Sequence, residues 1–157
     1  MLRSLVGSEM CIRDRFRNAR VIALDMVPWR RERAMEMGAL ATFSPDEDDL
    51  AARIRAMTTR KGVDVAIDTS GATSAHKLCL ESLRRKGRFS LVQGFAESPV
   101  SLGHFVWSGH QLFGAWHYNL GDYPKIMEVI RRSELLELLI SHRFPMSRIQ
   151  DAFALQE

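Results

Sequence analysis

The sequence VIALD at residues 21–25 sets the first expectation for the fold, because four consecutive apolar residues end in an acid. A continuous apolar run of this length is typical of a strand that is buried on both faces of a parallel sheet. Pro28 follows at a position suited to a first helical turn, and the helical pattern ends at Gly38. This stretch therefore predicts a buried strand that leads directly into a helix.

The same alternation of strand and helix patterns continues along the chain. Short apolar runs predict strands around Leu40–Phe43, at Asp64–Asp68 and in RFSLVQGF at 88–95. Helical patterns lie between them at 46–62 and 72–87, the second with Lys77, Arg84, Arg85 and Lys86 towards its end. Strands that alternate with helices at this spacing build a parallel sheet with right-handed crossovers. The predicted fold class is α/β with a doubly wound, Rossmann-type parallel sheet.

Composition excludes several classes of function. The chain has 157 residues, of which 46% are hydrophobic, and this suits one domain with a core. The net charge is only +3 with interleaved acids, which argues against a nucleic-acid partner. Apolar runs are too short to span a membrane. Cys11 and Cys79 are the only cysteines, so we expect no disulfide framework and a reducing, cytoplasmic location.

The first fifteen residues, MLRSLVGSEMCIRDR, fit neither a targeting segment nor a helix, because charges and Gly7-Ser8 interrupt every apolar run. They resemble one reading frame of a transposon adapter used to prepare sequencing libraries. We therefore expect residues 1–15 to be an artefactual segment and residues 16–157 to be a partial dinucleotide-binding domain.

Candidate binding residues lie at three predicted strand ends, because α/β sheets bind ligands beyond the carboxyl ends of their strands. Asp25 ends one strand, and an acid there accepts hydrogen bonds from the ribose hydroxyls of NAD and repels the 2′-phosphate of NADP. Its alternative role is to cap the turn before Pro28. Arg30 could cover the ribose, or it could be a solvated arginine like its neighbours. The other two strand ends supply Thr69, Ser70 and Gly71, and then Gln93, Gly94 and Phe95.

The ordered segments VIALD, RRERAMEMGA, GVDVAIDTSG and LRRKGRFSLVQG resemble the coenzyme domain of zinc-type, medium-chain alcohol and polyol dehydrogenases. The ending at 119–153, with ISHRFP at 140–145, is similar to that family's helix, return strand and last helix. The resemblance implies NAD-dependent hydride transfer to or from an alcohol or polyol. It also implies an N-terminal domain that carries the catalytic zinc, so we expect no metal ligand and no catalytic residue in this chain.

The resemblance further implies that a first strand and its G-x-G-x-x-G turn should precede VIALD, where this chain has one glycine, Gly7. That strand would lie between 21–25 and 64–68. Without it, we expect these two strands to pair directly, or the region to be disordered, rather than a good strand formed by residues 2–10. Residues 9–17 could extend as a helix into the FRNA segment at 16–19, where Asn18 would end it.

The resemblance places the strand at 112–116 at the sheet edge, where Gly114, Ala115 and Trp116 would pair across a homodimer or tetramer. Trp116 is also a candidate for backbone contact with the nicotinamide carboxamide. Two other functions stay open. They are a nucleotide-binding Rossmann module without catalysis and an adenosyl-methionine-dependent methyltransferase-like domain, since both use an acid after the second strand.

Other aromatic side chains receive structural interpretations. His76 is predicted to lie on the surface of its helix, and His142 to be structural. His104, His110 and His117 lack a neighbouring cysteine or carboxylate, which argues against a metal site. Trp107 and Trp116 are expected to pack rather than to stack on a cofactor.

Overall fold

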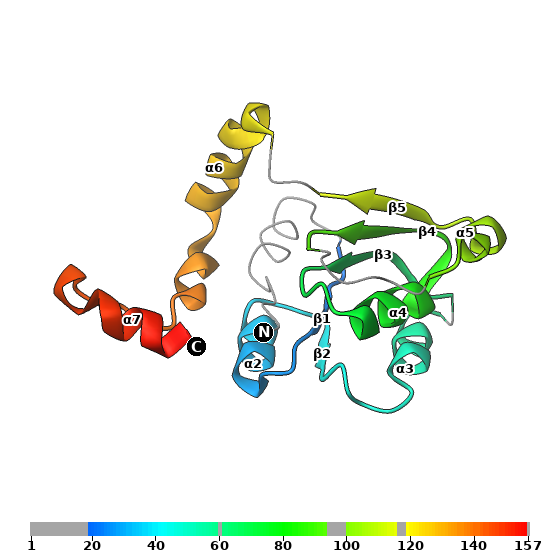
Figure 1. The fold of residues 1–157 in the computed structure, drawn as a ribbon, viewed down its shortest axis with the longest axis horizontal. Helices are drawn as coiled ribbons and strands as arrows, with labels where there is room; N and C mark the ends of the chain where they lie inside the picture. Colours follow the sequence, from blue (N-terminus) through cyan, green and yellow to red (C-terminus); the bar gives the residue numbers. More distant parts are fainter. Residues whose placement is uncertain (1–18, 60, 94–99, 116–118, 157) are drawn as a thin grey trace.

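A computed structural model describes residues 19–59, 61–93, 100–115 and 119–156, in which strands and helices alternate (Figure 1). The first part of the chain contains β1 (Ile22–Leu24), α2 (Pro28–Glu36), β2 (Ala41–Phe43), α3 (Leu50–Met57), β3 (Val63–Asp68), α4 (Thr73–Ser82), β4 (Leu83–Leu91), α5 (Leu102–Ser108) and β5 (Gln111–Gly114). The predicted elements over this part are therefore present, the helices with shorter bounds and β3 and β4 with earlier starts. The predicted helix end at Asn18 and the helix at 9–17 lie outside the described residues.

The strands form two parallel sheets, which confirms the α/β class. One sheet pairs β1 with β2, and the other has the order β3-β4-β5. In the second sheet Asp68, Leu91 and Gly114 lie side by side, so the carboxyl ends of its strands are level. Parallel strands need crossover connections, and α2, α4 and α5 supply them, whereas α3 leads from one sheet to the other.

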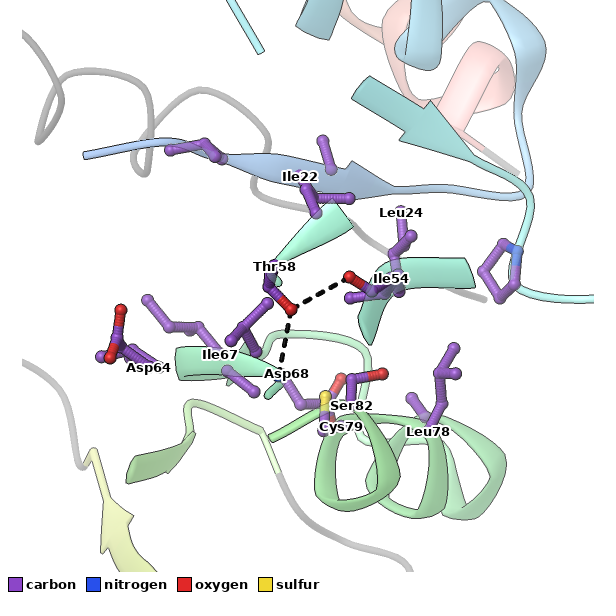
Figure 2. Close-up of a pocket in the computed structure, with 18 of the residues that line it drawn as sticks. Ile22, Leu24, Ile54, Thr58, Asp64, Ile67, Asp68, Leu78, Cys79 and Ser82 are labelled. Carbon is purple, nitrogen blue, oxygen red and sulfur yellow. Dashed lines mark hydrogen bonds between the residues drawn. The ribbon is translucent and has the colours of Figure 1, made fainter. Parts of the chain in front are cut away.

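Among the described residues no strand joins the two sheets. β1 and β3 are not paired within the described residues, so the expectation that they pair directly is wrong. A cavity of about 1040 Å³ lies between them and is lined by both strands and by side chains of α3 and α4. Figure 2 shows Ile22 and Leu24 on the β1 side of this cavity and Ile67 on the β3 side. Each strand pairs within its own sheet and contacts a helix of its own, β1 with α2 and β3 with α4.

Strand β4 begins earlier than the sequence predicts. The segment from Leu83 to Gly87 was expected to end a helix, but α4 stops at Ser82 and the strand starts at Leu83. Leu83 is only 1% exposed, and its burial draws the chain into the sheet. Pairing then shifts from Val63–Leu83 to Val65–Arg88, which leaves a bulge whose Lys86 has φ of 59°. Burial of one leucine thus overrides the helical pattern of its basic neighbours.

Two small apolar clusters stabilise the sheets. Ala23, Ala34, Met37 and Ala39 pack α2 against β1, and small side chains let the helix approach the strand closely. Leu80, Leu83 and Phe89 pack α4 against β4 in the second cluster. Each sheet therefore has its own core.

The C-terminal part contains helices and coil. It comprises α6 (Tyr123–Arg132), three short 3₁₀ segments, η1 (Leu120–Asp122), η2 (Glu134–Leu139) and η3 (Met146–Arg148), and α7 (Ile149–Gln156). The predicted return strand is wrong, because residues 134–145 have no ladder partner and Leu135 and Leu138 pack on the first cluster instead. Figure 1 shows α6 and α7 standing away from the sheets. Among the described helices, none is long and apolar enough to cross a membrane.

Candidate functional site

Asp25 follows β1 and is 4% exposed. Its Oδ1 accepts a hydrogen bond of 2.8 Å from the backbone N–H of Val27, so the carboxylate caps the turn before α2. Its Oδ2 is buried with no hydrogen-bond partner among the described residues. Asp25 also lines the cavity between the sheets. The residue therefore caps the turn with one oxygen and retains a second acceptor for another group.

Two arginines of α2 surround this carboxylate. Nη1 of Arg30 lies 3.7 Å from Oδ2 of Asp25, close enough for a weak ion pair but too far for a hydrogen bond. Nη1 of Arg31 donates to the backbone carbonyls of Asp25 at 2.7 Å and Met26 at 3.0 Å. Arg31 therefore fixes the backbone of the turn, while Arg30 adds positive charge beside the acceptor. The ribose contacts predicted for Asp25 and Arg30 stay predictions.

The predicted residues after β3 form a turn built on Asp68. Oδ1 of Asp68 accepts from the backbone N–H of Ser70 at 2.9 Å and from its hydroxyl at 2.7 Å. Oδ2 accepts from the backbone N–H of Gly71 at 3.1 Å. The Ser70 hydroxyl in turn accepts from the N–H of Ala72 at the start of α4. One buried carboxylate thus holds the path from strand to helix.

His76 lies behind this carboxylate, so the prediction of a surface histidine is wrong. The residue is 2% exposed, and its Nε2 lies 3.1 Å from Oδ2 of Asp68. The approach is not linear enough for a hydrogen bond, and Nδ1 has no partner among the described residues either. The imidazole and the Phe89 ring make an edge-to-face contact, with 6.0 Å between the ring centroids. A long-range contact with Asp68 and Phe89 therefore turns this side chain inwards.

Gln93 lies against the turn. Gly71 has φ of 71°, and a Cβ built on it would come within 3.3 Å of both Cγ and the carbonyl oxygen of Gln93. The structure thus brings together the candidates at the ends of β3 and β4. The cavity between β1 and β3 is lined by Asp25, Thr69 and Ser70. Gly94, Phe95 and Trp116 lie outside the described residues.

The geometry so far is an acid after β1 and a hydrogen-bonded turn after β3, and both line the cavity that runs between these two strands. A family model described as zinc-binding dehydrogenase matches residues 14–132. The chain belongs to the zinc-binding dehydrogenase family. This confirms the family resemblance of the sequence.

Curated relatives of the family are named as dehydrogenases. The chain is 33% identical to 2-dehydro-3-deoxy-L-galactonate 5-dehydrogenase of Pseudoalteromonas atlantica, over 80% of this chain and 37% of the relative. It is 29% identical to sorbitol dehydrogenase of Bacillus subtilis, over 84% of this chain and 38% of the relative. The chain therefore spans less than half the length of these relatives.

Solved structures of similar fold include alcohol dehydrogenase TADH from Thermus sp. ATN1. That structure matches with a TM-score of 0.82 and 21% identity, over 93% of this chain and 43% of the other. The 2R,3R-butanediol dehydrogenase of Bacillus subtilis matches with a TM-score of 0.70 and 21% identity, over 79% and 35%. These likenesses support the α/β fold.

The remaining histidines form no metal site within the described ranges, where no group of three potential ligands occurs. Nε2 of His104 lies 3.1 Å from Nδ1 of His110, whose own Nε2 lies 3.1 Å from the carbonyl oxygen of Arg84. That carbonyl accepts from Nε2–H, so His110 offers Nδ1 as an acceptor to Nε2–H of His104. Partial burial lowers the pKa of His110, and the Arg84 carbonyl opposes this effect. The two rings therefore form a hydrogen-bonded pair.

Other aromatic predictions have mixed outcomes. The Trp107 side chain is 82% exposed in this structure, so the expectation that it packs is wrong for the described chain. His142 is exposed and stacks on Phe144 at 6.2 Å between ring centroids, and its structural role stays a prediction. His117 and Trp116 lie outside the described residues.

Sequence reasoning missed Asp68 and His76 as parts of this site. The sequence DTSG at 68–71 contains the signal for the first, because an aspartate two residues before an N–H commonly closes such a turn. No local signal marks His76, since its partner lies eight residues earlier on another element.

Proposed function

We propose that residues 16–157 are part of the coenzyme domain of an NAD-dependent dehydrogenase that oxidises an alcohol or polyol, and that residues 1–15 are foreign to it. The observation that carries the proposal is the buried Oδ2 of Asp25, which has no hydrogen-bond partner among the described residues. A buried carboxylate oxygen without a partner is costly unless a donor meets it. The hydroxyl groups of a ribose are suitable donors, and the names of the relatives support the choice of dehydrogenase.

The residues present fit NAD. Asp25 would accept hydrogen bonds from the hydroxyl groups of the adenosine ribose. Nη1 of Arg30 lies 3.7 Å from Oδ2, which is too far for a hydrogen bond, so this oxygen can still accept from such a donor. Thr69, Ser70 and Gly71 would line the adenine or ribose side, in a turn that Asp68 already holds. Gln93 would approach the nicotinamide end through its backbone, with Gly94, Phe95 and Trp116 as further candidates. Bound NAD would supply the acceptor for a hydride.

The chain would bind and orient the cofactor rather than perform the proton chemistry. The described residues hold no cluster of three metal ligands, and we assign zinc and the proton relay to a part of the enzyme outside this chain. The alcohol or polyol would bind mainly to that part. The present chain alone is therefore expected to have no turnover.

We also propose that the intact enzyme assembles through the outer edge of β5. The backbone N–H of Ala115 donates to the carbonyl of Leu91 at 2.8 Å, so this donor is already used within the sheet. Donors alternate between the two sides of a strand, and the N–H of Gly114 therefore faces the outer edge. A twin strand related by a two-fold axis would pair there.

NMR titration of the chain with NAD, NADP and adenosyl-methionine tests the cofactor. Without a phosphate-binding turn we expect NAD to bind in the millimolar range, a free energy of about −4 kcal/mol. NAD should shift the backbone amide resonances of Val27, Ser70 and Gly71, and NADP should shift them less. Equal shifts with adenosyl-methionine, shifts confined to other residues, or no shifts with NAD would contradict the proposal.

A further inference from the structure

The turn after β3 depends on one carboxylate with little access to water. Asp68 is 4% exposed, and three donors of the turn approach it: the N–H and hydroxyl of Ser70 and the N–H of Gly71. An ionised carboxylate has about four acceptor sites. The fourth direction, beside Oδ2, faces Nε2 of His76 at 3.1 Å. A buried carboxylate needs such a polar neighbour, because an apolar one would leave its charge uncompensated.

His76 is placed there by α4 rather than by the turn itself. Its backbone N–H donates to the carbonyl of Ala72, so the residue lies one helical turn into α4. Its ring is fixed on the other side by the edge contact with Phe89 of β4. The imidazole therefore joins three elements, β3 through Asp68, α4 through its own backbone, and β4 through Phe89.

We propose that His76 is a positioning residue for the turn 69–71, which it holds by fixing the carboxylate of Asp68. Nε2 is the ring nitrogen that faces Oδ2, at 3.1 Å, although the contact lies outside hydrogen-bond geometry. The proposal therefore requires the hydrogen on Nε2, from which a small rotation of the ring would give a hydrogen bond to the carboxylate. The role in cofactor binding rests on the proposed function. The role in ordering the turn does not.

The consequence extends to Gln93. Gly71 lies so close to Gln93 that a Cβ on it would be 3.3 Å from the Gln93 carbonyl. A turn released from Asp68 would move Gly71 relative to this residue. His76 thereby influences the candidate contacts after both β3 and β4 without touching the cavity.

The first test uses the unmodified chain. Two-dimensional NMR correlation of the imidazole nitrogens reports which nitrogen of His76 carries the hydrogen. A hydrogen on Nε2 supports the proposal. The opposite tautomer would overturn it, because Nδ1 would then carry the hydrogen and a lone pair would face the carboxylate.

The second test compares His76→Leu with His76→Gln by solvent exchange of individual backbone amides. Leucine fills the space beside Phe89 without a donor, and glutamine places an amide N–H near the position of Nε2. We expect the Leu variant to exchange the Ser70 and Gly71 amides at least tenfold faster and the Gln variant to restore slow exchange. The amide of Val92 is the internal control, because it donates to the backbone carbonyl of Asp68 at 2.9 Å and not to the carboxylate.

A role in packing alone predicts the opposite order. The Leu variant would then protect Ser70 and Gly71 as well as the unmodified chain does, or all three amides would change together, and either result overturns the proposal. NAD titration of the same variants adds a separate measurement, in which the Leu variant should bind severalfold more weakly than the Gln variant. If the exchange result holds and no variant binds NAD, the proposed function fails while the positioning role stands.

Discussion

Replacing Asp25 with asparagine removes the charge beside the proposed ribose site and little else. Asparagine keeps the side-chain oxygen that accepts from the N–H of Val27 at 2.8 Å, so the turn before α2 should persist. The substitution changes Oδ2, the buried atom without a hydrogen-bond partner among the described residues. Asp25→Asn is therefore expected to alter the choice between NAD and NADP rather than the fold.

The size of the effect follows from charge repulsion. Two like charges about 4 Å apart repel by about 1 kcal/mol in water and by about 4 kcal/mol at an effective dielectric constant near 20. Asp25 is 4% exposed, which favours the larger value, while Arg30 at 3.7 Å from Oδ2 offsets part of the charge. We therefore expect the unmodified chain to prefer NAD over NADP by at least about tenfold, or ~1.4 kcal/mol. Asp25→Asn should bring the two dissociation constants close to each other.

Titrations with NAD and NADP at one fixed ionic strength measure this preference, since salt screens the repulsion. The matched control is Asp64→Asn. It makes the same chemical change near the start of β3, on a side chain that is 79% exposed. The control should keep the preference for NAD. An unchanged preference in Asp25→Asn, or an equal loss in Asp64→Asn, would refute the role of Asp25.

Two further predictions concern assembly and pH. In the intact enzyme Gly114→Pro removes the outer N–H of β5 and should shift the mass measured by light scattering from dimer to monomer. Gly114→Ala should leave the dimer intact, because a Cβ at this position meets nothing within 4 Å. Monomers in both variants, or in neither, would contradict this. His110 has its pKa lowered by partial burial, so the unfolded chain binds more protons as pH falls through the ordinary value of 6.5. Stability present at pH 7.5 is thus lost towards pH 5.5. The midpoint of urea unfolding should therefore fall more over this range in the unmodified chain than in His110→Gln. An equal fall in both proteins would contradict the prediction.

The fold could be predicted wherever its cause is local. The apolar run at 21–25 and the sequence at 63–68 are long enough to identify β1 and β3, and Pro28 marks the start of α2. The start of β4 could not be predicted in this way. Its basic residues suit a helix, and only the burial of Leu83 against Phe89 and Leu80 draws the chain into the sheet.

The candidate site divides in the same manner. Asp25 could be found because an acid after a buried strand is a local pattern, and DTSG at 68–71 is a local turn signal. His76 could not, since its burial depends on Asp68 and Phe89, which belong to β3 and β4. The return strand failed for a related reason. A strand needs an edge to pair with, and its sequence does not show that Leu135 and Leu138 pack on the first cluster instead.

The separation of β1 from β3 follows from the relative strengths of pairing and packing. β1 is three residues long, so direct pairing would add only a few ladder hydrogen bonds, worth about 0.5–1.5 kcal/mol each. Closing the gap would pull β1 from Ala34 or β3 from α4. Exposing a buried leucine side chain costs about 1.5–3 kcal/mol by comparison. Packing therefore prevails. The cavity that results keeps Asp25 and Ser70 on facing strand ends, so that one extended ligand could reach both only by crossing the gap between the two sheets.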